Sequence, residues 1–151
     1  MQHIMIIEDE TNIREELMLL LESVPYRVSA PKPEGDLLTL IREARPDLIL
    51  LDLGLPGIDG LTLCSLLRKE SAVPIIFVTG RNTSMDELNC LLRGGDDFLS
   101  KPYQPAILLA RISAVLRRTK REEDAALHWK NLKIDLASGT ISLPEGKSHP
   151  A

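Results

Sequence analysis

Residues 48–60, LILLDLGLPGIDG, contain a short apolar run that ends on an acid. Leu48 to Leu51 have the length and composition of a strand buried on both faces, and the segment after Asp52 is rich in glycine and proline. A carboxylate directly after such a strand is held rigidly, while the turn-rich loop that follows exposes it to a reagent. This stretch therefore indicates a buried strand that presents a functional group at its end.

The same alternation of apolar runs with segments of helical period continues on both sides of this stretch. Strands are expected at 3–7, 26–30, 48–51, 74–79 and 97–100, and helices at 11–23, 37–44, 60–70, 85–93 and 105–118. Apolar strands separated by helices imply a parallel sheet covered on both faces. Right-handed crossovers then predict a flavodoxin-like, doubly wound five-stranded sheet of order 2-1-3-4-5.

The composition and the apolar pattern of the sequence change after Arg118. Residues 121–126 read as a charged linker, and the alternating apolar residues around Ala137-Ser138-Gly139 predict a short β-hairpin. We therefore expect a first domain over residues 1–120, the linker, and a fragment of a second domain with its tail over residues 127–151.

Composition narrows the class of protein further. The net charge of −4 argues against a chain that coats nucleic acid. Cys64 and Cys90 have no metal-ligand spacing and are expected to be buried free thiols, and no apolar run approaches the roughly 18 residues that span a bilayer. These features favour a cytoplasmic protein without a membrane partner.

Polar residues occupy the carboxyl ends of four expected strands, the edge at which open α/β sheets bind ligands. Glu8 and Asp9 follow the first strand and Asp52 the third, which is its neighbour in the predicted order. Thr79 ends the fourth strand, and Lys101 follows the fifth. We expect these five side chains to share one pocket.

Three carboxylates at close range repel one another unless a cation intervenes, and Mg²⁺ prefers oxygen ligands of this kind. Lys101 adds an ammonium and Thr79 a hydroxyl donor, both suited to phosphoryl oxygens. The set as a whole predicts phosphoryl transfer onto Asp52 with Mg²⁺ as cofactor.

Simpler interpretations exist for each residue taken alone, since an acid after a strand is usually solvated and Thr79 could cap a helix. A Mg²⁺-dependent phosphatase or phosphotransferase with an aspartyl-phosphate intermediate is the main alternative. Such enzymes need a second Asp two residues after the nucleophile, where this chain has Gly54. A flavin carrier would need Ser or Thr after the first strand, where EDETN is acidic.

Five motifs together resemble the response-regulator receiver domains of the OmpR/PhoB subfamily of two-component systems, which have the CheY-like form of this fold. The motifs are IMIIEDE, PDLILLDLGLPGIDG, IIFVTG, GGDDFLSKPY and LLARISAVLRR, within residues 2–120. A weaker resemblance to the opening strands of a winged-helix DNA-binding domain covers residues 127–143.

The resemblance implies a role for each residue of the expected pocket. Asp52 matches the phosphoacceptor, which receives a phosphoryl group from a sensor histidine kinase. Glu8, Asp9, Asp52 and the Gly54 carbonyl match the Mg²⁺ ligands, and Thr79 and Lys101 match the switch hydroxyl and the phosphate-binding lysine. A non-enzymatic switch is implied, capable at most of slow self-dephosphorylation.

The resemblance also implies a homodimer formed by the fourth helix, fifth strand and fifth helix, which would control transcription. Asp97 and Arg111 match one ion pair of that interface, and Phe98 matches an aromatic residue whose rotamer follows phosphorylation. Glu87 and Ile107 replace another charged pair, so a weak dimer is expected. DNA binding is expected only of a full-length form.

Overall fold

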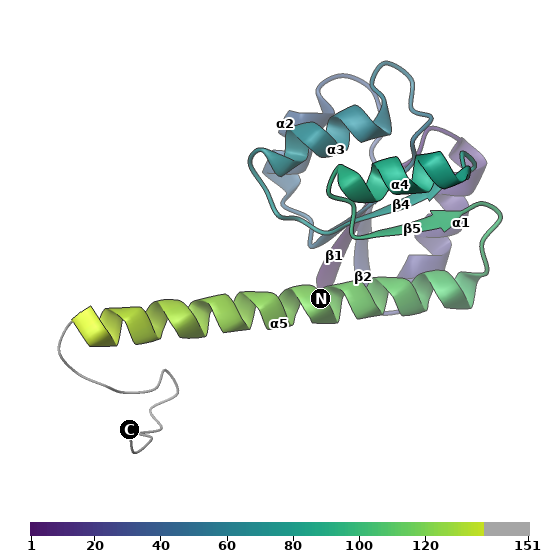
Figure 1. The fold of residues 1–151 in the computed structure, drawn as a ribbon. Coiled ribbons are helices and arrows are strands. Elements are labelled where there is room, and N and C mark those ends of the chain that lie inside the picture. Colours follow the sequence, from purple (N-terminus) through teal and green to yellow (C-terminus); the bar gives the residue numbers. More distant parts are fainter. Residues whose placement is uncertain (138–151) are drawn as a thin grey trace. The chain divides into compact units, whose positions relative to one another are not determined.

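The computed structural model describes the backbone of residues 1–137 and the side chains of residues 1–132. Five parallel strands form one sheet in the order β2-β1-β3-β4-β5, which confirms the predicted topology. The strands are β1 (Gln2–Ile7), β2 (Tyr26–Ser29), β3 (Leu48–Leu51), β4 (Ile75–Thr79) and β5 (Asp97–Ser100). Figure 1 shows the sheet in the middle of the unit formed by residues 1–116, between two layers of helices.

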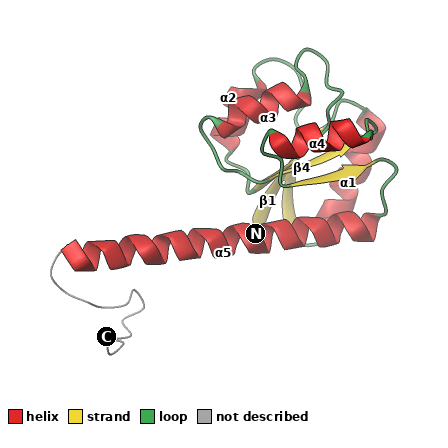
Figure 2. Ribbon diagram, viewed as in Figure 1, coloured by secondary structure: helices red, strands yellow, loops and turns green. Residues whose placement is uncertain are grey.

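The helices follow the strands in strict alternation, as Figure 2 shows. They are α1 (Thr11–Glu22), α2 (Leu37–Ala44), α3 (Gly60–Arg68), α4 (Ser84–Leu92) and α5 (Pro105–Ala137). All five strands and the helices α1, α2 and α4 begin and end within one residue of their predicted bounds. Local caps account for several starts: Asp36 caps α2, Asp59 caps α3, and Thr83 with Asp86 forms a capping box on α4.

Two apolar clusters lie on opposite faces of the sheet. Leu37, Ile41, Leu63, Leu67 and Cys90 pack from α2, α3 and α4 onto one face. Leu17, Leu21, Leu108 and Ile112 pack from α1 and α5 onto the other. Burying one such Leu or Ile contributes about 1.5–3 kcal/mol relative to leaving it exposed. Cys64 and Cys90 are buried free thiols within the first cluster, as the sequence predicted.

The C-terminal part of α5 contradicts the predicted hairpin. Residues 121–126, expected as a linker, and residues 127–137, expected as the first hairpin arm, are helical. An isolated hairpin is marginally stable, whereas extending a helix that already exists requires no new nucleus. Ala and Leu residues in this stretch also favour a helix. The expected second arm lies outside the described residues, and the assignment of 127–151 to a second domain stays a prediction.

Among the described residues, no helix combines the length and the apolar character needed to cross a bilayer. The long α5 helix is largely polar after Leu116, with an exposed run of charged side chains. Leu127 and Trp129 are its large exposed apolar residues there.

Candidate functional site

The polar residues predicted from the strand ends do meet at one edge of the sheet. Ile7 at the end of β1 pairs with Leu51 at the end of β3, so Glu8 and Asp52 leave the sheet side by side. The Asp52 amide continues this pairing by donating to the Ile7 carbonyl at 3.1 Å. Parallel register therefore determines where the two carboxylates lie, because neighbouring strands end at the same level.

Glu8, Asp9 and Asp52 each place a carboxylate oxygen within 4.8 Å of the others. Glu8 is 2% exposed and Asp52 9% exposed, whereas Asp9 is open to solvent. One exposed member leaves a route into the cluster from outside. Three hard oxygen donors at this spacing suit a divalent cation such as Mg²⁺, so the residues present fit that ion.

Lys101 directly follows β5 and joins the two buried acids. Its ammonium contacts Glu8 Oε1 and donates to Asp52 Oδ2 at 3.1 Å. The backbone holds this position, since the Lys101 amide donates to the Thr79 carbonyl at 2.9 Å. A cation from the fifth strand thus reaches carboxylates from the first and third.

The protonation preferences of these three groups differ. Burial raises the pKa of Glu8 to about 7, despite its hydrogen bond from Lys101, and the charge of Asp52 adds to the rise. Burial also acts to raise the pKa of Asp52, but hydrogen bonds from the Thr79 side chain and the Gly54 amide, together with the Lys101 ammonium, hold it below its ordinary value. Burial acts to lower the pKa of Lys101, yet the two carboxylates keep that pKa above its ordinary value. At neutral pH the site therefore holds an ionised Asp52 beside a charged lysine.

Thr79 ends β4 and is 1% exposed. Its hydroxyl oxygen accepts a hydrogen bond from the Arg81 amide at 3.2 Å. Gly54 lies in the loop after Asp52, and its amide donates to Asp52 Oδ1 at 3.2 Å. Every residue of the predicted site thus lies at the same sheet edge.

Close packing behind Asp52 explains a glycine at the start of α3. A Cβ on Gly60 would lie 2.5 Å from the Asp52 carbonyl oxygen and 3.0 Å from the Leu53 Cα. The Gly60 amide donates to the Leu53 carbonyl at 3.2 Å. The loop from Leu53 to Asp59 is therefore closed tightly on itself beneath the carboxylate.

Two arginines at the site were missed in the sequence. Arg14 donates from Nη1 to the Glu8 carbonyl oxygen at 2.9 Å. Arg81 contacts Asp86 at 3.3 Å and lies 3.9 Å from Asp59, so it links the starts of α3 and α4. A signal for Arg14 was present, because a cation in the first turn of a helix opposes the helix dipole and needs a compensating contact.

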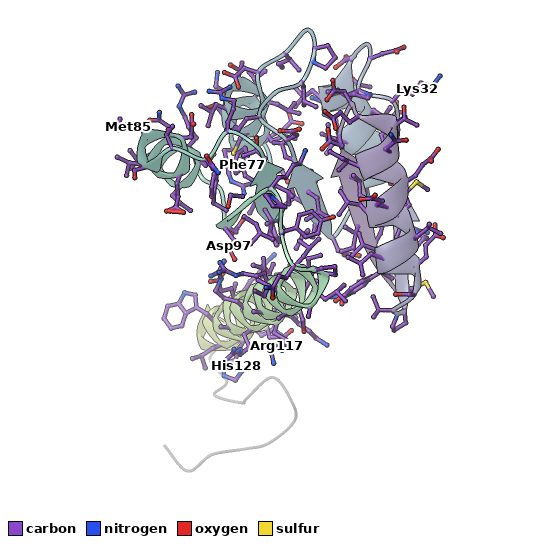
Figure 3. All side chains as sticks on the ribbon, turned by 90° about the vertical axis from the view of Figure 1, so that its right-hand side faces the viewer. Lys32, Phe77, Met85, Asp97, Arg117 and His128 are labelled. Atoms are coloured by element: carbon purple, nitrogen blue, oxygen red, sulfur yellow. The ribbon has the colours of Figure 1, made fainter. Side chains whose placement is uncertain are left out.

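Apart from the pocket, the exposed side of α4 and the start of α5 carry several large apolar residues. Met85, Leu88, Leu91, Leu92 and Ile107 are each more than 40% exposed, and Figure 3 shows Met85 on the outer side of α4. Leu108 and Ile112, on the same helix as Ile107, pack instead against the sheet. Helical periodicity in the sequence does not show which of these side chains the sheet covers.

The family of response regulator receiver domains matches residues 4–113 of the chain. The chain is 42% identical over 142 residues to the transcriptional regulatory protein AfsQ1 of Streptomyces coelicolor, covering 94% of this chain and 63% of AfsQ1. It is 35% identical over 141 residues to the DNA-binding response regulator MtrA of Mycolicibacterium smegmatis, covering 93% and 62%. The chain therefore spans somewhat less than two thirds of the length of these relatives.

Solved structures agree with this relationship. The beryllofluoride-activated receiver domain of Klebsiella pneumoniae RstA superposes with a TM-score of 0.73 at 35% identity, covering 77% of this chain and 99% of that one. A two-component response regulator from Clostridium difficile gives 0.75 at 33% identity, covering 79% and 98%. Together with the strand order and the acidic pocket, these matches show that the chain belongs to the response-regulator receiver family of two-component systems, among relatives of the OmpR/PhoB type.

Proposed function

We propose that Asp52 is the phosphoacceptor of this receiver domain. The observation that carries the proposal is the position of Lys101, whose ammonium contacts both buried acids beside an ionised Asp52. An Asp52 oxygen would attack the phosphorus of a phosphohistidine, and the bond from phosphorus to the imidazole nitrogen would break. The product is an acyl phosphate at the end of β3.

Glu8, Asp9, Asp52 and the Gly54 backbone carbonyl would hold Mg²⁺. When bound, the ion neutralises charge on the transferring phosphoryl group. The chain's own part is to hold its carboxylates within 4.8 Å of one another and to keep one of them open to solvent. The fit of the donor set supports this ligand assignment.

Lys101 and Thr79 would bind the oxygens of the new phosphoryl group. Lys101 already lies 3.1 Å from Asp52 and can move its ammonium onto a phosphate oxygen without leaving the pocket. The Thr79 hydroxyl can keep the hydrogen bond that it accepts from the Arg81 amide and turn its own proton from Asp52 to a phosphoryl oxygen. Charge-assisted hydrogen bonds of this kind are roughly twice as strong as neutral ones.

A phosphorylation switch fits this site better than a phosphatase. An aspartyl-phosphate hydrolase needs an acid two residues after the nucleophile, and this chain has Gly54, whose amide instead donates to Asp52. The relatives named above are regulators. Slow self-dephosphorylation by solvent water is compatible with an exposed entry at Asp9.

The proposed phosphodonor is a sensor histidine kinase, and the proposed output is a homodimer formed through α4, β5 and α5. Asp97 and Arg111 are ion-paired within the chain at 2.9 Å, so a dimer would share or exchange this pair. Exposed Leu88 and Leu91 supply an apolar centre, while Glu87 and Ile107 leave the interface without one charged pair. Transcriptional control is proposed for the whole protein, by analogy with AfsQ1 and MtrA.

The phosphate signal would leave the pocket through Thr79 and Phe98. Phe98 neighbours Phe77 in the sheet register and is 9% exposed, so its ring is already turned inward. An inward ring vacates the surface between α4 and α5 that a partner would cover. Phosphorylation would stabilise this arrangement by drawing Thr79 toward Asp52.

Intact-mass spectrometry with acetyl phosphate tests the phosphoacceptor. We expect a single phosphoryl adduct that requires a divalent cation and is lost both in Asp52→Asn and with EDTA. Thr62, an exposed residue on α3, offers a control in Thr62→Ala, which should leave the adduct intact. An undiminished adduct on the Asn variant would refute the assignment.

A further inference from the structure

We propose that Arg14 is a positioning residue that holds the Glu8–Glu10 turn in the geometry Mg²⁺ requires. This inference rests on the proposed metal site but concerns a residue outside the ligand set. Arg14 lies in the first turns of α1, is partly buried, and donates from Nη1 to the Glu8 carbonyl oxygen at 2.9 Å. Its Nη2 atom lies 3.5 Å from the Thr11 hydroxyl oxygen, so the guanidinium spans the turn and the helix start.

The argument turns on Asp9, the exposed acid of the cluster. Among the described residues no hydrogen bond holds its carboxylate, unlike those of Glu8 and Asp52. Its direction therefore depends on the two peptide units that flank it. The unit before Asp9 is held by Arg14 at the Glu8 carbonyl, and the unit after it by the Glu10 amide, which donates to Glu8 Oε2 at 3.2 Å.

Removing Arg14 would free the first of these two peptide units. Mg²⁺ demands near-octahedral geometry at short ligand distances. Ordering a ligand that sits on a mobile turn therefore costs free energy when the ion binds and lowers the affinity. Groups that orient metal ligands typically change metal affinity 10–100-fold when mutated. Arg14 acts through the backbone, so we expect about 10-fold, the lower end of that range.

A positioning role and a purely electrostatic role for Arg14 predict opposite changes in Mg²⁺ affinity for Arg14→Gln. If Arg14 acted only by its charge, it would repel Mg²⁺, and Arg14→Gln would bind the ion more tightly while Arg14→Lys would match the wild type. If Arg14 acts by holding the turn, both variants bind more weakly, because neither keeps the planar fork that bridges the Glu8 carbonyl and Thr11.

The test is a Mg²⁺ titration of ¹⁵N-labelled protein, following the amide signals of residues 8–10 and 52–54 by NMR. We expect a dissociation constant about 10-fold higher in both Arg14 variants, with the remaining amide spectrum and the melting temperature close to wild type. Arg42→Lys is the matched control, because it alters an exposed arginine that pairs with Glu70 at 2.9 Å and touches no residue of the pocket.

Phosphorylation by acetyl phosphate supplies a second readout. A positioning role predicts that the rate of the Arg14→Lys variant falls at low Mg²⁺ and returns to near wild type when Mg²⁺ is saturating. Dissociation constants within twofold of wild type, or tighter binding by Arg14→Gln, would overturn the inference. A wild-type protein that binds Mg²⁺ but forms no adduct would overturn the phosphoacceptor assignment instead, and the titration would still decide the role of Arg14.

Discussion

Gly60→Ala should destabilise the domain by pressing on the backbone of the proposed phosphoacceptor. The added Cβ would lie 2.5 Å from the Asp52 carbonyl oxygen, and ordinary contact begins at 3.4 Å, a shortfall of 3.4 − 2.5 = 0.9 Å. The facing atoms are backbone atoms of Asp52 and Leu53, which cannot turn aside as a side chain can. Either α3 or the loop beneath the carboxylate must move.

Overpacking of this kind typically costs about 1–3 kcal/mol. Because the facing atoms belong to the backbone, the upper half of that range, about 2–3 kcal/mol, applies here. Alanine regains up to about 1 kcal/mol over glycine in a helix, so a net loss of about 1–2 kcal/mol is expected. For a domain of this size that loss corresponds to a fall of roughly 4–8 °C in melting temperature. The proposed Mg²⁺ ligand set should bind the ion more weakly as well, because Asp52 is displaced.

Urea unfolding of wild type, Gly60→Ala and Gly80→Ala measures the effect. A Cβ on Gly80 meets no atom within 4 Å and Gly80 has no positive φ, so Gly80→Ala should be neutral or slightly stabilising. If Gly60→Ala unfolds at the wild-type midpoint while Gly80→Ala behaves as expected, the close packing behind Asp52 does not constrain the site.

Three further predictions concern stability and assembly. Burial and the charge of Arg27 lower the pKa of His3, against the opposing effect of Asp47, so the unfolded chain binds the proton more readily and the free energy of unfolding falls as pH drops below 6.5. In urea unfolding between about pH 7 and 5, His3→Gln should lose this pH dependence of the unfolding free energy, and an unchanged dependence would contradict the prediction. Arg68 donates to the carbonyls of Gly94 at 2.9 Å and Val73 at 2.7 Å and pairs with Asp96 at 3.1 Å, so Arg68→Ala should cost about 2–3 kcal/mol of unfolding free energy. Removing the exposed pair that Arg42 makes with Glu70 should cost much less unfolding free energy in the same assay. Equal losses of unfolding free energy for Arg68 and Arg42 would show that Arg68 does not tie α3 to the loops. Arg111→Ala should scarcely change the free energy of unfolding, because its pair with Asp97 is partly exposed. In sedimentation, we expect beryllofluoride to promote self-association of the wild type and Arg111→Ala to weaken it; association that neither beryllofluoride nor Arg111→Ala changes would place the output on another face.

Several features could be predicted from the sequence because they depend on local pattern and on rules of chain topology. The apolar runs and the helical periods locate the elements, and right-handed crossovers then leave one simple strand order. The ends of parallel strands meet at one edge of the sheet. The grouping of Glu8, Asp52 and Lys101 follows from that order without any knowledge of side-chain contacts.

The C-terminal region shows where local pattern fails. Apolar residues between 127 and 136 fit both an alternating and a helical period, and the sequence alone favoured the hairpin. Which conformation forms depends on whether a partner strand is at hand, and the expected second arm lies outside the described residues. The resemblance to a winged-helix domain supplied a partner that this chain's described part does not contain.

The sequence by itself determined the order of the sheet and which polar residues lie at the edge where the proposed site forms, because the parallel register places the ends of neighbouring strands at the same level. Tertiary structure alone decided the contacts within that edge. Lys101 contacts two acids from different strands, Arg14 donates to the Glu8 carbonyl, and Gly60 lets the Asp52 backbone approach closely. Likewise Leu108 and Ile112 face the sheet rather than a partner. These outcomes depend on side-chain distances and helix rotation, which are set by packing between segments far apart in the chain.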